Sequence, residues 1–199
     1  MRVVPEPLEL PLFPLQTVLF PGGVLLLKIF EPRYMDMVGE CLKGEKPFGV
    51  CLISEGSEVG APAVPHLVGT TARIMTWDMP QTGILHVTVR GERRFRILGC
   101  EAAKNGLIRG RVDLLPECPI EALPEADAAL VPLLRVIAAD LGEERLPAPH
   151  HFGDAEWVGM RLAEVLPIPN VARQKLLELE SPADRLEIIR RFLEQKGLV

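Results

Sequence analysis

LPLFPLQTVLFPGG, at Leu10–Gly23, is followed by IFEPRY at Ile29–Tyr34. Large apolar residues alternate in short runs within the first segment, and Pro11, Pro14 and a Pro-Gly-Gly corner interrupt them. Because proline has no backbone donor, we expect these extended pieces at sheet edges or in corners. The segment therefore predicts short strands that turn sharply and then lead into a helix at EPRY.

Beyond this corner the apolar period changes from that of a strand to that of a helix. One stripe of a helix is formed by residues at i, i+3, i+4, i+7 and i+8, namely Tyr34, Met37, Val38, Cys41 and Leu42. Pro32 suits the first helical turn, and Gly44 suits the residue just past the end. The pattern predicts a helix over residues 32–43 with one buried face.

Further segments with strand character extend to residue 115. They are Val24–Ile29, Phe48–Ile53, Val68–Asp78, Ile84–Arg90, Phe95–Ala103 and Leu107–Leu115. Apolar and polar residues alternate in Ile84–Arg90, which is typical of a strand with one solvent-facing side. Asn105-Gly106 is a strong hairpin signal. Many short strands joined by tight turns favour a small, partly closed barrel that leaves few exposed edges.

After Pro116 the composition shifts to helix formers. We predict helices over residues 125–141, 154–166, 171–180 and 182–196. Pro132 should kink or split the first of them, and Asp154, Asn170 and Ser181 are expected to cap the other three. The predicted fold class is α+β, with a β-rich lobe at 8–118 and a helical bundle at 121–196.

The overall composition is that of an ordinary globular protein, with 48% hydrophobic and 25% charged residues. A net charge of −5 argues against bulk binding to nucleic-acid phosphates. The longest apolar run, at 18–30, contains Pro21, two glycines and Lys28, so it falls short of the ~20 residues that span a bilayer. The N-terminus lacks a signal-peptide pattern. We therefore expect a cytoplasmic protein that does not enter a membrane.

The four cysteines, at positions 41, 51, 100 and 118, are scattered and form no C-x-x-C pair. This spacing favours small buried residues over disulfides or zinc ligands. His150-His151 with Asp154 and Glu156 is the one cluster of metal-ligand types in the sequence. Adjacent histidines point apart, and the two acids equally suit the start of a helix. We predict no metal site there.

Reactive groups do not combine into a catalytic pattern. Ser54 and Ser57 lie in a loop segment without G-x-S-x-G, and Ser181 is explained as a helix cap. Gly39–Lys46 has glycines at the spacing of a phosphate-binding loop, but Glu45 stands where the lysine is needed. The sequence therefore predicts no catalytic residue, no cofactor and no enzyme.

The order of these segments resembles the N-terminal, substrate-binding domain of Lon proteases. The resemblance is carried by the opening segment and by FGVCLI at Phe48–Ile53, VGTTARI at Val68–Ile74, GERRFRI at Gly91–Ile97 and the run Leu162–Glu187. It implies a PUA-like pseudo-barrel followed by helices. Full Lon proteases carry ATPase and protease modules after this domain, whereas this chain ends at Val199 before either. The resemblance thus implies recognition of polypeptide without proteolysis.

The predicted binding site lies at the Pro/Gly corners, where apolar side chains cannot all turn inward. Its candidate peptide-binding residues are Phe20, Pro21, Phe30, Arg33 and Tyr34. Main-chain pairing along a sheet edge would supply affinity, and pockets for alternate side chains would supply selectivity. The expected partners are exposed apolar segments of unfolded polypeptide or another protein. Phenylalanines such as Phe20 and Phe30 are more often core residues than contact residues, and the alternative role of Arg33 is an ion pair with Glu31 or Asp36.

Two other functions fit parts of the sequence. An RNA-binding module would use the arginines at 90, 93, 94, 96, 109 and 111 on paired strands. Few aromatic residues accompany them for base stacking, and Glu92, Glu101 and Asp113 dilute their charge. A regulatory protein that docks onto another protein, such as a protease ring, is the second alternative. The sequence leaves the oligomeric state open.

Overall fold

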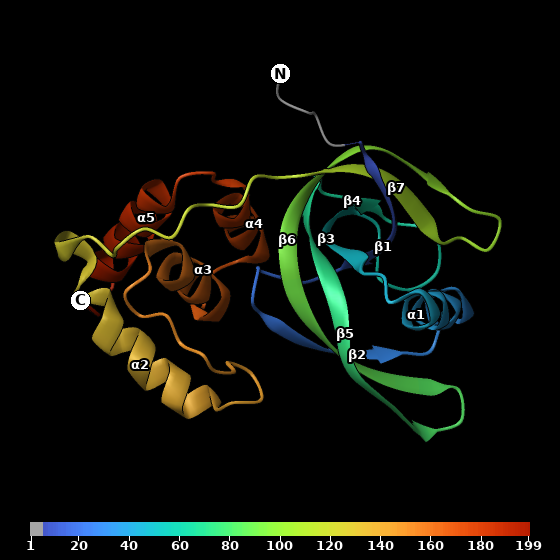
Figure 1. The fold of residues 1–199 in the computed structure, drawn as a ribbon, viewed down its shortest axis with the longest axis horizontal. Helices are drawn as coiled ribbons and strands as arrows, with labels where there is room; N and C mark the ends of the chain where they lie inside the picture. Colours follow the sequence, from blue (N-terminus) through green and yellow to red (C-terminus); the bar gives the residue numbers. More distant parts are fainter. Residues whose placement is uncertain (1–5) are drawn as a thin grey trace. The chain divides into compact units, whose positions relative to one another are not determined.

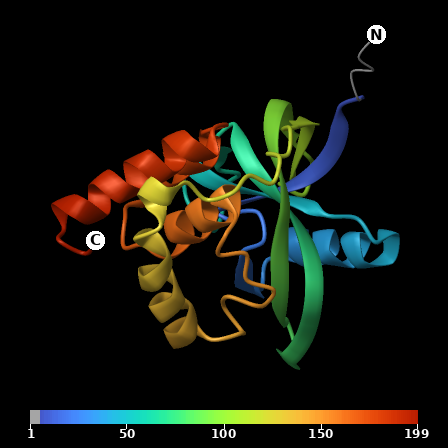
Figure 2. The same cartoon turned by 60° about the vertical axis from the view of Figure 1, so that its left-hand side comes forward.

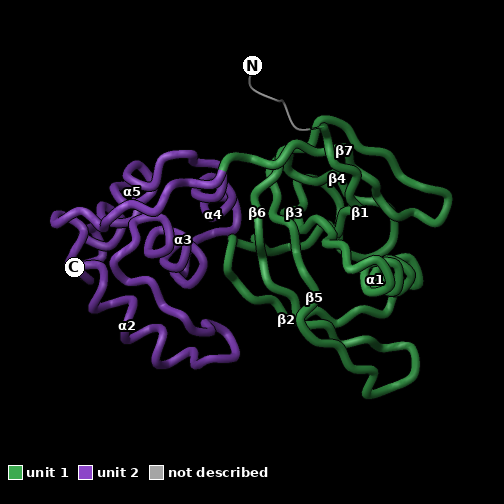
Figure 3. The backbone as a smooth tube through the Cα atoms, viewed as in Figure 1, with its two compact units in different colours: residues 1–116 green, residues 117–199 purple. Residues whose placement is uncertain are grey.

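A computed structural model of the chain describes residues 6–199 (Figure 1). The chain divides into two compact units, unit 1 at residues 1–116 and unit 2 at residues 117–199 (Figure 3). Among the described residues, unit 1 holds all the strands and helix α1 (Pro32–Gly44), while unit 2 is built from helices and loops.

Unit 1 is formed around one seven-stranded sheet. Its strands are β1 (Leu8–Leu15), β2 (Val24–Ile29), β3 (Phe48–Glu55), β4 (Val64–Pro65), β5 (Val68–Gln81), β6 (Ile84–Ala102) and β7 (Ile108–Leu114). The order is β1-β7-β6-β5-β3-β4, and β2 pairs with β6 outside this path. Because β1 also pairs with β3 in parallel, the hydrogen-bonded path returns from β3 to β1.

The prolines of β1 do not place this strand at an edge, which corrects the expectation from the sequence. Residues 8–12 pair with β7, and residues 12–15 pair with β3. Leu12 is the one residue of β1 with a partner on both sides. Each half of β1 therefore pairs through only one side of its backbone. Pro11 and Pro14 are tolerated because each of them has a neighbouring strand on one side only.

The longest strand, β6, joins two segments that the sequence analysis separated. It runs without a break through Gly91–Arg94, first between β2 and β5 and then between β5 and β7. Its pairing with β5 contains register shifts at Thr70/Ala72 and Ile74/Thr76, and shifts of this kind let a strand bend without ending. Figures 1 and 2 show the β5–β6 hairpin running on beyond the rest of the sheet.

Helix α1 packs four residues of its predicted stripe against the sheet, whereas the fifth, Leu42, is exposed, which corrects the expectation that it is buried. Tyr34, Met37, Val38 and Cys41 are buried in one core cluster with residues of β1, β2, β3 and β6. The helix includes Gly44, and the left-handed position that follows is occupied by Glu45, with φ of 50°. The end of the helix was thus predicted one residue too early.

Unit 2 contains α2 (Leu130–Leu141), α3 (Ala155–Val165), α4 (Asn170–Glu178) and α5 (Pro182–Gln195). Asp154 and Ser181 cap α3 and α5 as expected, each accepting backbone N–H groups of the first turn. The segment 125–141 is split as expected, into a 3-10 turn at residues 125–127 and α2, but the break precedes Pro132, which lies in the first turn of α2. The expected cap at Asn170 was wrong, because Asn170 is the first residue of α4.

The cysteines differ in their surroundings, contrary to the expectation that all are buried. Cys41 and Cys51 are buried, Cys118 is half-buried and Cys100 is exposed. Burial raises the pKa of the Cys41 thiol to about 11 and raises the pKa of Cys51 as well. Neither buried cysteine is therefore in the reactive thiolate form near neutral pH.

This difference predicts the order in which the thiols react. With iodoacetamide at pH 8, Cys100 should be alkylated at least about a hundredfold faster than Cys41, since a thiol of pKa about 11 is thiolate in roughly one molecule in a thousand. Mass spectrometry of peptides from timed samples measures both rates. Equal alkylation rates of Cys41 and Cys100 in the folded protein would contradict the burial of Cys41.

Residues 6–199 contain neither a membrane-spanning helix nor a cluster of metal-ligating side chains. None of the helices described there is long and apolar enough to cross a bilayer. Nor does any group of three or more His, Cys, Asp or Glu side chains in that range have an arrangement that would hold a metal ion. Asp154 serves as a helix cap, and the Nε2 of His150 lies 3.0 Å from the carbonyl oxygen of Leu146.

Candidate functional site

The Pro/Gly corner, residues 20–23, is fixed to the centre of β6. The N–H of Gly22 donates to the carbonyl of Gly91 at 2.7 Å, and the N–H of Gly91 donates to the carbonyl of Gly23 at 2.8 Å. Gly22 has a φ of 78°, which favours glycine. A Cβ on Gly91 would lie 2.3 Å from the carbonyl oxygen of Phe20. The corner is therefore held where the two backbones touch.

Strand β2 leaves this corner and has one free edge. Within the described part of the chain it pairs with β6 alone, from Val24 opposite Arg90 to Ile29 opposite Leu85. In a two-sided strand the N–H and C=O groups alternate between the two edges, so the second edge of β2 presents main-chain groups that no other strand pairs. An edge of this kind is a template for an added strand.

A groove of about 290 Å³ runs beside β2 and is called the β2 groove here. Its lining comes from β1, β2, the start of α1 and the loop after β3, and includes Phe13, Leu25, Phe30, Tyr34, Glu58 and Val59. The carboxylate of Glu58 accepts a short hydrogen bond from the N–H of Gln16, which fixes the loop wall. The groove therefore places apolar side chains next to the strand edge.

Tyr34 forms a rigid part of the wall. Its ring stacks on Phe13 with centroids 4.1 Å apart, and the guanidinium carbon of Arg33 lies 4.7 Å from the ring centroid. Burial raises the pKa of the Tyr34 hydroxyl, and the nearby Glu31 and Glu58 carboxylates raise it further against the effect of Arg33. The side chain is thus a neutral, fixed surface at physiological pH.

The five candidate peptide-binding residues do not share one location. Phe30, at 51% exposure, and Tyr34 line the β2 groove. Phe20 is 0% exposed and belongs to the interior, while Pro21 is half-buried in the corner outside the groove lining. Arg33 is buried and bonds to the Glu31 carboxylate at 2.9 Å and to the carbonyl of Gly106 at 3.1 Å. Phe20, Pro21 and Arg33 therefore position the groove without lining it.

Exposed apolar residues that were not predicted from the sequence lie on β2 and on β5, the two strands that flank β6. Leu26 of β2 is 71% exposed, and Met75, Trp77 and Met79 of β5 are exposed as well. A cavity of about 390 Å³ joins Leu26 and Lys28 to Trp77 and shares three residues of β2 with the groove. The alternation of large apolar residues in MTWDM was the available signal. Leu26 and Trp77 therefore extend the apolar surface beyond the groove.

The arginines of the RNA-binding alternative do not form one exposed stripe. Arg94 is buried, whereas Arg96 and Arg111 are exposed. Arg109 pairs with the carboxylate of Glu40 at 3.0 Å. The strand positions thus divide these charges between the interior, an ion pair and the surface.

Comparison with known proteins gives the family. The model of the ATP-dependent protease La (LON) substrate-binding domain matches residues 9–195, so this chain belongs to that family. The fold is similar to that of a Lon N-terminal domain protein from Xanthomonas campestris, with a TM-score of 0.78 and 35% identity over 92% of this chain and 98% of that chain. The resemblance inferred from the segment order is confirmed, and the matched domain is mostly β-sheet with some helices.

More distant relatives extend the comparison. The N-terminal domain of the Mycobacterium avium complex Lon protease has a TM-score of 0.65 at 18% identity, covering 92% of this chain and 96% of that one, and shows the shared fold alone. Cereblon from Xenopus tropicalis is 32% identical over 58% of this chain and 26% of its own length. The Lon protease of Anaeromyxobacter dehalogenans is 23% identical over 96% of this chain and 23% of its own length. This chain spans about a quarter of these curated relatives.

Proposed function

We propose that this protein recognises extended apolar segments of polypeptide and has no catalytic activity of its own. The observation that carries the proposal is the free edge of β2 beside the apolar β2 groove. A bound segment would add a strand to β2 and place alternate side chains against Phe30 and Tyr34. Membership in the Lon substrate-binding family supports binding of polypeptide, and the matched domain is not the ATPase or protease part of Lon.

The finer architecture belongs to the same proposal. We interpret the return of the strand path from β3 to β1 as a PUA-like pseudo-barrel at residues 8–118. Residues 121–196 are interpreted as a helical bundle that forms a second lobe. The binding edge then belongs to the first lobe, because β2 and the residues lining the groove all lie before residue 60.

The expected affinity follows from the apolar area that a short bound segment would bury. Burying ~300 Å² of apolar surface at ~25 cal/mol/Å² gains ~7 kcal/mol before the costs of association are subtracted. A single copy should therefore bind weakly, with fast release. Weak binding with fast release suits a protein that samples many exposed segments. It also means that a binding experiment needs high protein concentrations.

Fluorescence anisotropy of labelled apolar peptides and of a denatured protein tests the proposal. Phe30→Ser and Leu26→Ser should each weaken binding about fivefold or more, which corresponds to ~1 kcal/mol. The control is Leu98→Ser on β6, because Leu98 is also an exposed leucine but does not line the groove. The proposal fails if the chain shows no saturable binding, or if Leu98→Ser reduces the affinity as much as the groove variants do.

A further inference from the structure

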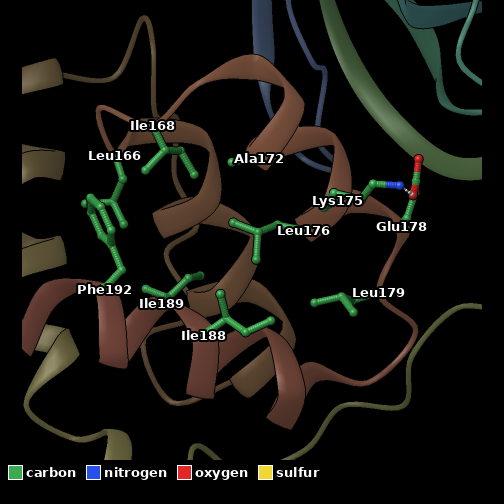
Figure 4. A pocket seen from close by; sticks show the side chains of 10 residues that line it. All are labelled: Leu166, Ile168, Ala172, Lys175, Leu176, Glu178, Leu179, Ile188, Ile189 and Phe192. Carbon is green, nitrogen blue, oxygen red and sulfur yellow. Dashed lines mark hydrogen bonds and ion pairs between the residues drawn. The ribbon is translucent and has the colours of Figure 1, made fainter. Parts of the chain in front are cut away.

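Unit 2 contains an apolar pocket of about 460 Å³ between α4 and α5 (Figure 4). Eight of its ten lining residues are apolar; α4 contributes Leu176, α5 contributes Ile188 and Phe192, and the loop before α4 contributes Ile168. Figure 4 shows Ile168 and Ile188 on opposite sides with Leu176 between them. This pocket is separate from the β2 groove, since its lining comes entirely from unit 2.

The main-chain acceptors of the pocket wall already have partners. The carbonyls of Leu176 and Leu179 accept from the guanidinium of Arg185 at 2.9 and 2.6 Å. The carbonyl of Leu166 accepts from Arg173 at 3.0 Å and from the N–H of Ile168 at 2.8 Å. An extended segment in this pocket would find no strand edge to pair with, and its own N–H and C=O groups would be desolvated without compensation.

A helix does not carry this cost, because its backbone groups bond to one another. The pocket is also framed as a helix groove: Ala172 and Leu176 lie at i and i+4 on α4, Leu179 follows directly after its last residue, and Ile188 and Phe192 lie at i and i+4 on α5. Two such stripes side by side form the ridges against which a third helix packs. The apolar side chains of the occupant should therefore recur with helical spacing.

Charge at the rim narrows the class of helix. Lys175 and Glu178 stand together at one end of the pocket, joined at 3.0 Å (Figure 4). The Glu178 carboxylate accepts from both Lys175 and Gln174, so both of its oxygens are engaged. The Lys175 side chain is largely exposed, and its ammonium has three donors. The rim therefore favours an acidic side chain on the occupant.

We propose that this pocket, called the α4–α5 groove, binds an amphipathic helix of a protein partner, with apolar residues at i, i+3 or i+4 and i+7 and acidic residues on its flank. The two units then recognise different backbone conformations. The β2 groove pairs with an extended segment, and the α4–α5 groove accepts a segment whose backbone is already satisfied.

The test uses the full chain and two labelled peptides of the same composition, one with leucines at helical spacing and glutamates on the flank, the other with leucines at alternate positions. The helical peptide should bind saturably to the wild-type chain. Ile188→Glu should weaken it at least about tenfold, because a charge would be placed in the apolar contact. Val171→Glu is the matched control, since Val171 is 62% exposed on α4 and does not line the groove, compared with 49% for Ile188.

Three results would overturn the proposal. The first is that the helical peptide shows no saturable binding to the wild-type chain. The second is that Ile188→Glu binds this peptide with an affinity within about twofold of the wild-type value. The third is that Val171→Glu and Ile188→Glu lose equal amounts of affinity for it. Lys175→Glu gives an independent readout: it should weaken the acidic helical peptide and strengthen a peptide with lysines on the flank. If Lys175→Glu keeps the wild-type preference for the acidic peptide over the lysine peptide, the partner helix does not need acidic residues on its flank.

Discussion

Arg185→Met is expected to lower the free energy of unfolding of unit 2 by about 3–5 kcal/mol. The Arg185 side chain is 0% exposed, and its guanidinium donates to the carbonyls of Leu176 and Leu179 and to the carboxylate of Glu156. Methionine fills a similar volume but supplies none of these donors. The α4 end would lose its attachment to α5, and a partly buried carboxylate would lose its cation.

Tryptophan fluorescence follows this unit specifically. The chain has two tryptophans, Trp77 in unit 1 and Trp157 in unit 2, where Trp157 packs on Phe152 with ring centroids 5.2 Å apart. Urea titration in a Trp77→Phe background therefore reports on unit 2. The control is Arg191→Met, which removes an exposed arginine that pairs with Glu187 on the same helix and should change stability by less than about 0.5 kcal/mol. Equal effects of the two substitutions would contradict the role given to Arg185.

Gly91→Ala is expected to destabilise unit 1 by about 3 kcal/mol. The added Cβ would lie 2.3 Å from the carbonyl oxygen of Phe20, so the backbone of the corner must move. That movement would also lengthen the hydrogen bonds that join Gly91 to Gly22 and Gly23. Because β2 starts directly after the corner, its position beside β6 should loosen in the same variant.

Gly99→Ala is the matched control on the same strand. A Cβ on Gly99 meets no atom within 4 Å, so this substitution should be nearly neutral. Hydrogen exchange measured by mass spectrometry should show faster exchange of residues 20–29 in Gly91→Ala and no change in Gly99→Ala. Identical protection of the corner in both variants would show that the close contact at Gly91 does not hold it.

Local sequence patterns predicted the elements whose signals are local. The stripe from Tyr34 to Cys41 marked α1, and the caps at Asp154 and Ser181 marked the starts of two helices, since both signals act within a single turn. The continuity of β6 could not be predicted in this way. Polar and charged residues at 92–94 are tolerated inside the strand because three other strands pair with it along its length.

Two of the five candidate residues, Phe30 and Tyr34, line the β2 groove, and the other three do not. The corner and the sheet edge were expected, but exposure depends on partners that are distant in sequence. Phe20 and Phe30 have the same side chain and lie ten residues apart, yet Phe20 is fully buried before the corner, whereas Phe30, directly after β2, is about half-exposed. The apolar pocket of unit 2 was not predicted, because Ile188 and Phe192 lie beside the buried face of α5, which is formed by Leu186, Ile189 and Leu193.

Backbone methylation of a bound peptide tests the central claim most directly. In an added strand, alternate N–H groups of the peptide face β2 and the others face away. Two versions of one apolar peptide, N-methylated at odd or at even positions, are titrated with the full chain by anisotropy. The account predicts that one version loses binding while the other keeps its affinity within about twofold. Equal affinity of the two versions would contradict pairing with the edge of β2.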